Sequence, residues 1–201
     1  MIAIIDYDAG NIKSVEKALR FLDAEVCITR DANEIEAAEK VVLPGVGAFG
    51  DAMNKLYQYQ LVETIRNVIE KGTPFLGICL GMQLLFERSE ESMGVEGLGI
   101  LKGEILRIPD SQGLKVPHIG WNALSFPNEG RLFRGISEES YVYFVHSYYL
   151  KAEDARIVTA TTEYGTHIHA SVEKDNVFAC QFHPEKSSDI GLRILENFIH
   201  I

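Results

Sequence analysis

Residues 74–86, which read PFLGICLGMQLLF, restrict the possible folds of this chain more than any other stretch. The apolar run Phe75–Ile78 is typical of a buried parallel strand, and the residues after Cys79 suit a helix, with almost no linker between the two. The pattern Gly77-x-Cys79-x-Gly81 predicts a nucleophile elbow, a sharp turn from strand to helix in which small neighbours let the backbone fold back. The sulfur would then lie at the top of a sheet beside the first N–H groups of a helix, where a thiolate is favoured. The alternative is a structural cysteine between two closely packed glycines.

Strand and helix patterns alternate along the first 86 residues. Besides the elbow strand, three short apolar segments are predicted as strands: Met1–Asp6, Glu25–Thr29 and Lys40–Leu43. Helical spacing places two sets of apolar residues on helix faces: Val15, Ala18, Leu19 and Leu22, and then Leu61, Val62, Ile65, Val68 and Ile69. Residues 8–11 are predicted to form a turn, Asn11 and Asp31 to cap helices, and Gly72 to end one. The alternation predicts an α/β fold, a doubly wound, mostly parallel open sheet with helices on both faces.

After Phe86 the pattern changes to short strands. Aromatic and β-branched segments between turn residues predict a β-rich C-terminal half. The predicted strands are Glu104–Ile108, Leu124–Phe126, Tyr141–Leu150, Ile157–Thr162, His169–Glu173 and Val177–Phe182. A closing helix is predicted from Ile190, Ile194, Leu195, Phe198 and Ile199. Neither a linker nor an internal repeat interrupts the sequence, so we expect a single domain over residues 1–201.

The composition argues against several classes of function. The 201 residues carry 19 Lys and Arg against 29 Asp and Glu, a net charge of −10, so a nucleic-acid partner is not expected. No apolar run approaches the roughly 20 residues that span a bilayer, and the N-terminus lacks the basic region of a signal peptide, so no membrane contact is expected. The spacing of Cys27, Cys79 and Cys180 does not suggest a disulfide framework, which favours a cytoplasmic protein. His167 and His169 have no further ligand at metal-binding spacing, so we expect neither a metal nor a cofactor.

A thiolate that attacks an acyl or amide carbon needs a base, and His183 is the candidate. It directly follows the predicted strand Val177–Phe182, at the sheet edge where open α/β folds bind their ligands. Because Pro184 favours an extended residue before it, His183 and Glu185 should point the same way, and the carboxylate could hold one ring nitrogen. A surface ion pair is the alternative.

The segment Pro44–Gly47 could supply N–H groups for an oxyanion hole, since it follows the predicted strand Lys40–Leu43. Glycines on both sides of Val46 would let its N–H point toward a substrate, with the N–H of Leu80 as the second donor. The same glycines would let this peptide turn away at modest strain, so we expect two orientations that a partner could bias. A plain turn is the alternative.

Five stretches together resemble the class I glutamine amidotransferases. They are residues 44–50 (PGVGAFG), 77–86 (GICLGMQLLF), 117–122 (PHIGWN), 143–148 (YFVHSY) and 181–187 (QFHPEKS). The first, second and fifth are typical of the whole family, and the other two are similar to the glutaminase subunits of imidazole glycerol phosphate synthases. The resemblance extends from the first predicted strand to the last helix and implies the fold of the family.

The resemblance also implies roles for individual residues. The implied catalytic triad is Cys79, His183 and Glu185, with oxyanion N–H groups from Val46 and Leu80. The residues implied to hold glutamine are Gly45, Gly47, Gln83, Ser147 and Tyr148. Those implied to lie near a cyclase subunit, a (β/α)8 barrel that forms a heterodimer with the chain, are Asn11, Trp121, Asn122 and Lys186.

The activity implied by the resemblance is hydrolysis of glutamine to glutamate and ammonia. The ammonia would pass to the cyclase, which makes imidazole glycerol phosphate and an aminoimidazole carboxamide ribonucleotide in histidine biosynthesis. Two residues depart from the family pattern: Asp8 stands where glycine is usual, and Ile168 stands where an aromatic residue is common. The first departure concerns the shape of the first loop, and the second concerns local packing.

Several alternatives remain open from the sequence. Trp121, the only tryptophan, could be a core residue, and the tyrosines of 141–150 could be plain sheet residues. The chain could be the glutaminase subunit of another synthase, such as pyridoxal phosphate synthase. It could also be a Cys-elbow hydrolase without glutamine specificity, or a non-enzymatic flavodoxin-like binding module.

Overall fold

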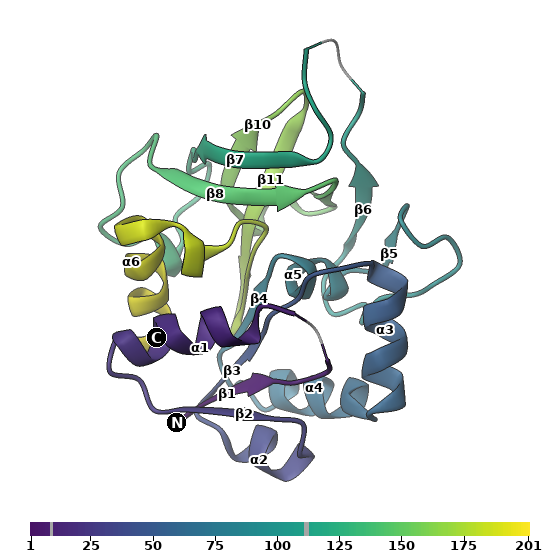
Figure 1. The fold of residues 1–201 in the computed structure, drawn as a ribbon, viewed down its shortest axis with the longest axis vertical. Helices are drawn as coiled ribbons and strands as arrows, with labels where there is room; N and C mark the ends of the chain where they lie inside the picture. The colour runs from purple at the N-terminus through teal and green to yellow at the C-terminus, as the bar shows by residue number, and fades with distance from the viewer. Residues whose placement is uncertain (9, 111–112) are drawn as a thin grey trace.

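A mixed sheet of ten strands runs through the computed structural model, which describes residues 1–8, 10–110 and 113–201 (Figure 1). The strands of this sheet are β1 (Ile2–Ile5), β2 (Val26–Thr29), β3 (Lys40–Leu43), β4 (Phe75–Ile78), β5 (Arg88–Ser89), β6 (Gly103–Arg107), β9 (Tyr148–Ala152), β10 (Val158–Glu163), β11 (His167–Lys174) and β12 (Val177–Cys180). Their order is β2-β1-β3-β4-β12-β11-β9-β6-β5, and β10 pairs with β11. A separate antiparallel ribbon of β7 (His118–Ala123) and β8 (Tyr141–His146) packs beside β10 (Figure 1).

The strands β2, β1, β3, β4 and β12 form a parallel unit that is covered on both faces. Alternate strand residues face opposite sides, as the pleat of a strand requires. Ile2 and Ile4 pack with α1 (Ile12–Phe21) and α6 (Ser188–Ile199). Ala3 and Ile5 pack in a second core with the helices of the other face, which are α2 (Ala32–Ala37), α3 (Phe49–Gln58), α4 (Leu61–Glu70) and α5 (Leu80–Leu84). The predicted doubly wound arrangement is therefore confirmed.

The remainder of the sheet is mainly antiparallel, as predicted for a β-rich C-terminal half. β11 pairs antiparallel with β12, β10 and β9, and β9 pairs in the same sense with β6. The short strand β5 is parallel to β6. Single 3-10 turns lie at η1 (Arg131–Phe133), η2 (Ala155–Ile157) and η3 (Pro184–Lys186).

Two of the predicted C-terminal strands are wrong in extent. The predicted strand Tyr141–Leu150 is interrupted at Ser147, because the chain leaves the ribbon after β8 and enters the large sheet as β9. The predicted strand at 124–126 begins where β7 has already ended. Only Ser125 pairs there, as an isolated bridge to Thr161, and Pro127 has no N–H with which to continue a ladder.

Smaller differences concern ends and caps. β12 ends at Cys180, two residues before the predicted end, and α3 was not predicted although Phe49, Ala52, Met53 and Leu56 bury one helical face. Asp31 caps α2 as predicted, since its carboxylate accepts from the N–H groups of Asn33 and Glu34. The predicted turn at 8–11 includes Ala9, which lies outside the described residues.

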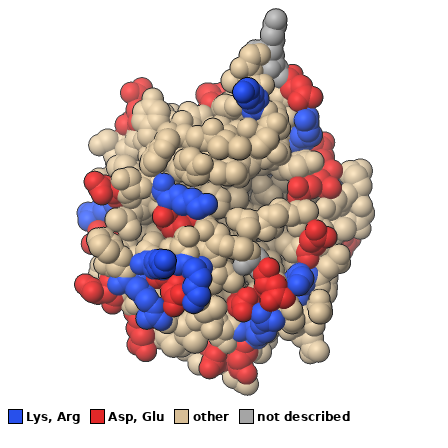
Figure 2. All heavy atoms as spheres, in the orientation of Figure 1, with Lys and Arg blue, Asp and Glu red and all other residues tan. Residues whose placement is uncertain are grey.

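Among the described residues, no helix has both the length and the apolar character needed to cross a bilayer. Acidic and basic side chains are interspersed on the face shown in Figure 2.

Candidate active site

Cys79 occupies the predicted sharp turn between β4 and α5. Its φ of 55° and ψ of −112° are strained for a residue with a side chain. The neighbouring glycines are needed for close approach: a Cβ on Gly77 would lie 2.9 Å from the Gly81 carbonyl oxygen, and one on Gly81 would lie 1.8 Å from that of Leu43. The helix that follows has only five residues, so its dipole is smaller than the sequence suggested. The elbow geometry is confirmed, and it places the sulfur at the carboxyl edge of the parallel strands.

His183 lies beside Cys79 because β12 runs parallel to β4 and ends at the same edge of the sheet. Its backbone is extended, as predicted, with φ −100° and ψ 96°. The ring Nδ1 lies 2.8 Å from Glu185 Oε1. The reason differs from the prediction, since Glu185 lies in the 3-10 turn η3 and not in an extended segment. Because a carboxylate only accepts hydrogen bonds, Nδ1 carries the proton, which leaves Nε2 for the sulfur.

The electrostatic surroundings favour a charged His183. Burial lowers the pKa of the ring, but hydrogen bonds with Cys79 and Glu185 and the negative charges of both raise the pKa to about 9. The side chains of His183 and Glu185 are 3% and 0% exposed, so solvent screens this pair weakly. The ring is therefore protonated at neutral pH and can give a proton to a leaving group.

The loop of residues 44–47 is present, but the two predicted oxyanion N–H groups do not converge. The N–H of Leu80 donates to the carbonyl of Gly45 at 3.3 Å. Because the carbonyl and the N–H of a trans peptide point in opposite directions, the N–H of Val46 points away from Leu80. The structure thus holds the peptide Gly45–Val46 in the turned-away orientation. Of the two orientations expected for this peptide, the structure shows the one in which the Val46 N–H is turned away from Leu80.

Tyr7, which the sequence did not single out, lies beneath this loop. Its side chain is 1% exposed, and its hydroxyl donates to the carbonyl of Pro44 at 2.8 Å. A Cβ on Gly45 would lie 2.4 Å from the same hydroxyl oxygen, so only glycine fits there without a shift. Burial, and to a smaller extent the charge of Cys79, raises the pKa of Tyr7 well above its usual value. The hydroxyl therefore remains a donor that supports the observed loop.

A cavity of about 310 Å³ opens over Cys79. Most of the predicted catalytic, oxyanion and glutamine-binding residues line it: Cys79, His183, Val46, Leu80, Gly47, Gln83, Ser147 and Tyr148. Gly45 and Glu185 lie just behind this lining, against Leu80 and His183. Glu91, which the sequence did not single out, lines the cavity too, and its carboxylate accepts from the N–H of Phe49 at 2.7 Å.

The side-chain amide of Gln83 is fixed by hydrogen bonds within the protein. Its Nε2 donates to the Tyr148 carbonyl and to Gln181 Oε1, both at 3.0 Å. Both amide hydrogens are therefore used, and only the Gln83 carbonyl oxygen is left to accept from a ligand. Gln181 was not predicted as a site residue, yet it is fully buried and its Nε2 lies 3.8 Å from Cys79 Sγ.

Asn11 reaches the same centre from the start of α1. It does not cap that helix as predicted, since its backbone is left-handed (φ 71°) and its side chain makes no capping bond to the described residues. Instead its Nδ2 donates to Glu185 Oε1, the oxygen that also contacts His183. Glu185 Oε2 is buried and accepts no hydrogen bond from the described residues. Asn11 thus links the first loop to the carboxylate.

The other residues predicted near a partner are spread more widely. Trp121 is 51% exposed on β7, with its ring against Tyr143, so it is not a core residue. Asn122 uses its Nδ2 to donate to the Glu163 carbonyl at 3.0 Å. Lys186 lines the cavity over Cys79.

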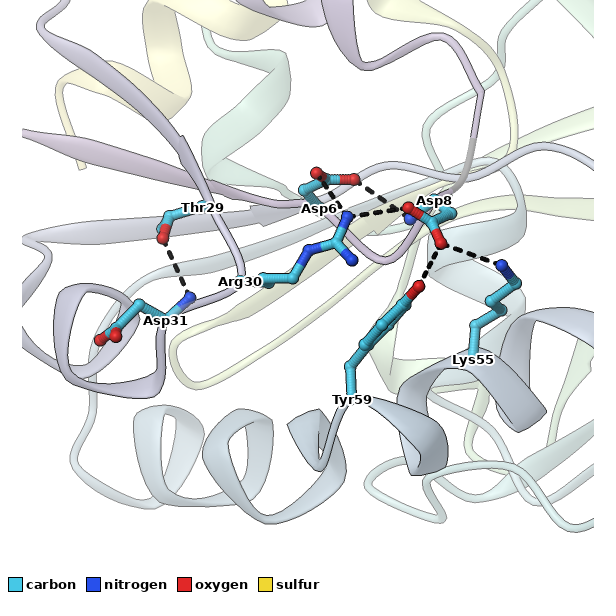
Figure 3. A network of polar contacts seen from close by, with 7 residues as sticks. All are labelled: Asp6, Asp8, Thr29, Arg30, Asp31, Lys55 and Tyr59. Carbon is cyan, nitrogen blue, oxygen red and sulfur yellow. Dashed lines mark hydrogen bonds and ion pairs between the residues drawn. The ribbon is translucent and has the colours of Figure 1, made fainter.

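Asp8 stands where the family usually has glycine, and its backbone conformation and side-chain contacts show how it fits there (Figure 3). Its φ of 61° is the left-handed conformation that glycine adopts easily. Its carboxylate accepts from Tyr59, from Lys55 at 2.9 Å and from Arg30 at 2.8 Å. These bonds, led by the one from Tyr59, lower the pKa of Asp8 far below its usual value. Asp8 thus joins the first loop to α3 and to the end of β2.

The described residues contain no group of three or more His, Cys, Asp or Glu side chains arranged to hold a metal ion.

Residues 3–201 match the family described as glutamine amidotransferase class-I. The fold agrees with a crystal structure of a glutamine amidotransferase at a TM-score of 0.77 and 19% identity, with both chains fully covered. It also agrees with the structure of PurLQS from Thermotoga maritima at a TM-score of 0.74 and 20% identity, with 99% of this chain and 97% of that chain covered. The chain therefore belongs to the class I glutamine amidotransferases.

Within this class, the sequence is similar over nearly its whole length to one type of subunit. The chain is 53% identical over 198 residues to imidazole glycerol phosphate synthase subunit HisH of Caldanaerobacter subterraneus, with 98% of this chain and 97% of the relative covered. It is 50% identical over 201 residues to subunit HisH of Methanocaldococcus jannaschii, with both chains fully covered. It is 53% identical over 196 residues to subunit HisH of Aquifex aeolicus, with 97% and 94% covered. Within the class, the chain groups with these HisH subunits.

Proposed function

We propose that this chain is the glutaminase subunit of an imidazole glycerol phosphate synthase. It hydrolyses glutamine to glutamate and ammonia and passes the ammonia to a cyclase subunit in histidine biosynthesis. The observation that carries the proposal is the cavity in which Cys79 lies beside a His183 ring held by Glu185. The similarity to HisH subunits over nearly the whole chain supports the same assignment.

In the proposed reaction the Cys79 thiolate attacks the side-chain amide carbon of glutamine. The carbon–nitrogen bond breaks as the His183 imidazolium gives its proton to the departing ammonia, and a γ-glutamyl thioester remains on Cys79. The neutral ring then takes a proton from water, which attacks the thioester and releases glutamate and the thiolate. The raised pKa of His183 supports its first role, because the ring begins the cycle protonated.

The oxyanion of each tetrahedral intermediate would be stabilised by the N–H groups of Val46 and Leu80. This requires the peptide Gly45–Val46 to rotate, which breaks the bond between the Leu80 N–H and the Gly45 carbonyl. Gly47, with a φ of 105°, gives the loop a flexible neighbour for this rotation. We propose that binding of the cyclase favours the rotated form, so that ammonia is released only when an acceptor is present.

Glutamine would lie in the cavity with its amide toward Cys79. The predicted contacts are Gly45, Gly47, Gln83, Ser147 and Tyr148, and Glu91 extends this set. A free amino acid carries an ammonium group, and Glu91 supplies a carboxylate at the wall of the cavity. The set is supported by the lining of the cavity, except that Gly45 acts from behind it.

A surface beside the cavity has the character of a partner interface. The outer side of the β7–β8 ribbon exposes Ile119 (60%), Trp121 (51%) and Tyr141 (59%), and Val46 is 40% exposed at the cavity. Large apolar side chains in water favour burial against another protein. We propose that this surface, with Asn11, Asn122 and Lys186, contacts a cyclase subunit with a (β/α)8 barrel.

We further propose a single amidotransferase domain over residues 1–201 and a cytoplasmic location. The family match over residues 3–201 supports the first proposal. Three free cysteines, Cys27, Cys79 and Cys180, support the second, since such thiols persist in a reducing compartment.

The experiment combines the purified chain with candidate partners and [15N-amide]glutamine. We expect 15N to enter imidazole glycerol phosphate, but not the aminoimidazole carboxamide ribonucleotide that leaves in the same step, and only with the imidazole glycerol phosphate cyclase subunit. We also expect a glutamine-analogue electrophile to label Cys79. Activation by the pyridoxal phosphate synthase partner instead would assign the chain to that enzyme. Failure of the electrophile to label Cys79 would favour a hydrolase without glutamine specificity, or a binding module.

A further inference from the structure

Two buried histidines that the proposed reaction does not use face each other across the β7–β8 ribbon. His118 of β7 and His146 of β8 are cross-strand partners, 3% and 6% exposed. Their rings are joined from His118 Nδ1 to His146 Nε2 at 3.0 Å. The His118 ring is stacked between Phe144 and Tyr164, with centroid distances of 4.9 Å and 3.8 Å. His146 lines the cavity over Cys79.

The contacts determine which nitrogen of each ring carries a proton. His146 Nδ1 lies 2.9 Å from the Tyr148 carbonyl, which can only accept, so His146 must donate from Nδ1. A neutral His146 then has a lone pair on Nε2, and His118 must donate to it from Nδ1. Both rings are therefore in the Nδ1–H tautomer, which is a specific and measurable arrangement.

The surroundings keep the pair uncharged. Burial lowers the pKa of His146 to about 3, against a weaker opposing effect of its bond to Tyr148, and burial lowers the pKa of His118 to about 4. The charges of His118 and His183 lower the pKa of His146 further. The nearby His183 has the opposite behaviour, because a carboxylate and a sulfur face it. Neighbouring histidines thus differ in charge at neutral pH.

The Tyr148 carbonyl connects the pair to the reactive sulfur. It accepts from His146 Nδ1 and from Gln83 Nε2, at 2.9 and 3.0 Å. Gln83 Nε2 also donates to Gln181 Oε1, and Gln181 Nε2 lies 3.8 Å from Cys79 Sγ. A continuous chain of hydrogen bonds therefore runs from the ribbon, through one carbonyl and two amides, to the nucleophile.

We propose that His118 and His146 act as a pair of positioning residues for the glutamine site. Their bonds fix the Tyr148 carbonyl, and with it the orientation of Gln83 and the cavity wall at 145–148, where the Val145 carbonyl oxygen lies 3.9 Å from Cys79 Sγ. The inference rests on the proposed function for its kinetic consequence only. The pair shapes the bound substrate's surroundings and transfers no proton to it, so its loss weakens glutamine binding more than it slows the chemical step.

The first test measures the tautomers and needs no variant and no activity. Two-bond 1H–15N correlation spectra of the 15N-histidine-labelled chain should show His118 and His146 both neutral and protonated on Nδ1 from pH 5 to pH 8. A His146 ring that carries its proton on Nε2, or either ring titrating near pH 6.5, would overturn the proposal. If the wild-type chain failed to hydrolyse glutamine with its cyclase, the proposed function would be wrong. The spectra would still show whether His118 and His146 are neutral and protonated on Nδ1.

The second test uses steady-state glutamine hydrolysis by the complex with the cyclase. His118→Phe keeps a ring between Phe144 and Tyr164 but removes the donor, and His146→Leu removes both bonds. We expect each to raise KM for glutamine by about tenfold, with kcat within about twofold of wild type. His146→Asn places a donor near the Tyr148 carbonyl, so its KM should lie much closer to the wild-type value than the KM of His146→Leu does.

The matched control is the same substitution at an exposed histidine of β11, His167→Asn, which should leave both constants unchanged. A fall in kcat with unchanged KM in the two pair variants, or no rescue by His146→Asn, would contradict a positioning role.

Discussion

The segment of residues 183–187 and the loop of residues 44–47 contribute to the same cavity, but they differ in how firmly they are held. The N–H of His183 donates to the Tyr143 carbonyl at 2.9 Å, its own carbonyl accepts from Ser187 Oγ at 2.6 Å, and its ring is fixed by Glu185. In the loop, the peptide Gly45–Val46 is turned so that its carbonyl takes the Leu80 N–H, and Val46 is 40% exposed.

This difference separates two requirements of the proposed reaction. The residues that move protons are in place in the isolated chain, whereas the donors that would stabilise the negative charge are not. Electrostatic stabilisation of that charge is usually the largest single contribution to such catalysis. We therefore expect the isolated chain to bind glutamine but to hydrolyse it slowly until the loop turns.

The largest effect should follow removal of the nucleophile. Cys79→Ala should abolish glutamine hydrolysis, a loss on the order of 10⁶ by analogy with other triads, while the fold survives. The matched control is Cys180→Ala. Because Cys180 is buried in β12, this substitution should lower the stability of the fold at most and leave the reaction intact. Glutaminase assays with the cyclase, together with melting curves, measure both. Full activity in the Cys79 variant would refute the mechanism.

Within the firmly held segment, we expect one loss as large as that of the nucleophile and one that is smaller. His183→Ala should lower turnover by about 10⁶, and Glu185→Gln by about 10⁴, because glutamine can still accept from the ring but cannot stabilise its positive charge. Stopped-flow or steady-state kinetics of the complex give the two losses. Equal or reversed losses would mean that Glu185 does more than orient His183.

Loss of the contact between Asn11 and Glu185 is expected to lower kcat about tenfold. Asn11→Gly suits the left-handed backbone (φ 71°) and removes only the side-chain donor to the carboxylate, so kcat should fall while KM stays nearly constant. Gln60→Gly is the control, since Gln60 occupies the same left-handed position (φ 56°) at the start of α4. Similar changes in both variants would show that the backbone, and not the bond to Glu185, is responsible.

The smallest effect, and one of opposite sign, is expected in the loop. Tyr7→Phe removes the hydroxyl that donates to the Pro44 carbonyl and so loosens the turned-away form. Turnover of the isolated chain should rise up to about tenfold, while turnover with the cyclase changes little. A fall in both activities would mean that Tyr7 supports the reactive form of the loop instead.

The parts of the site that the sequence predicted depend on local spacing. The elbow at Cys79 requires small residues at 77 and 81, and the pairing of His183 with Glu185 requires only two residues of separation. Both could be inferred because a short segment determines them. The parallel unit of the sheet was predicted for the same reason, since each strand and helix carries its own apolar pattern.

The parts that were missed depend on distant residues or on a single peptide. Tyr7 reaches Pro44, and Gln181 reaches Cys79, only after β1, β3, β4 and β12 have paired. The orientation of the peptide Gly45–Val46 is set by one hydrogen bond, and flanking glycines permit either form. The helix α3 is different, because its apolar residues recur at helical spacing and the sequence alone is enough to predict it.

Whether the triad is assembled while the oxyanion loop is not can be decided by measuring kcat and KM for glutamine with and without the cyclase and its ligand. We expect the isolated chain to bind glutamine but to hydrolyse it slowly, and the liganded cyclase to raise kcat far more than it changes KM. If the isolated chain hydrolysed glutamine as fast as the complex, the loop would not limit the reaction, and a free-standing hydrolase would be the better description.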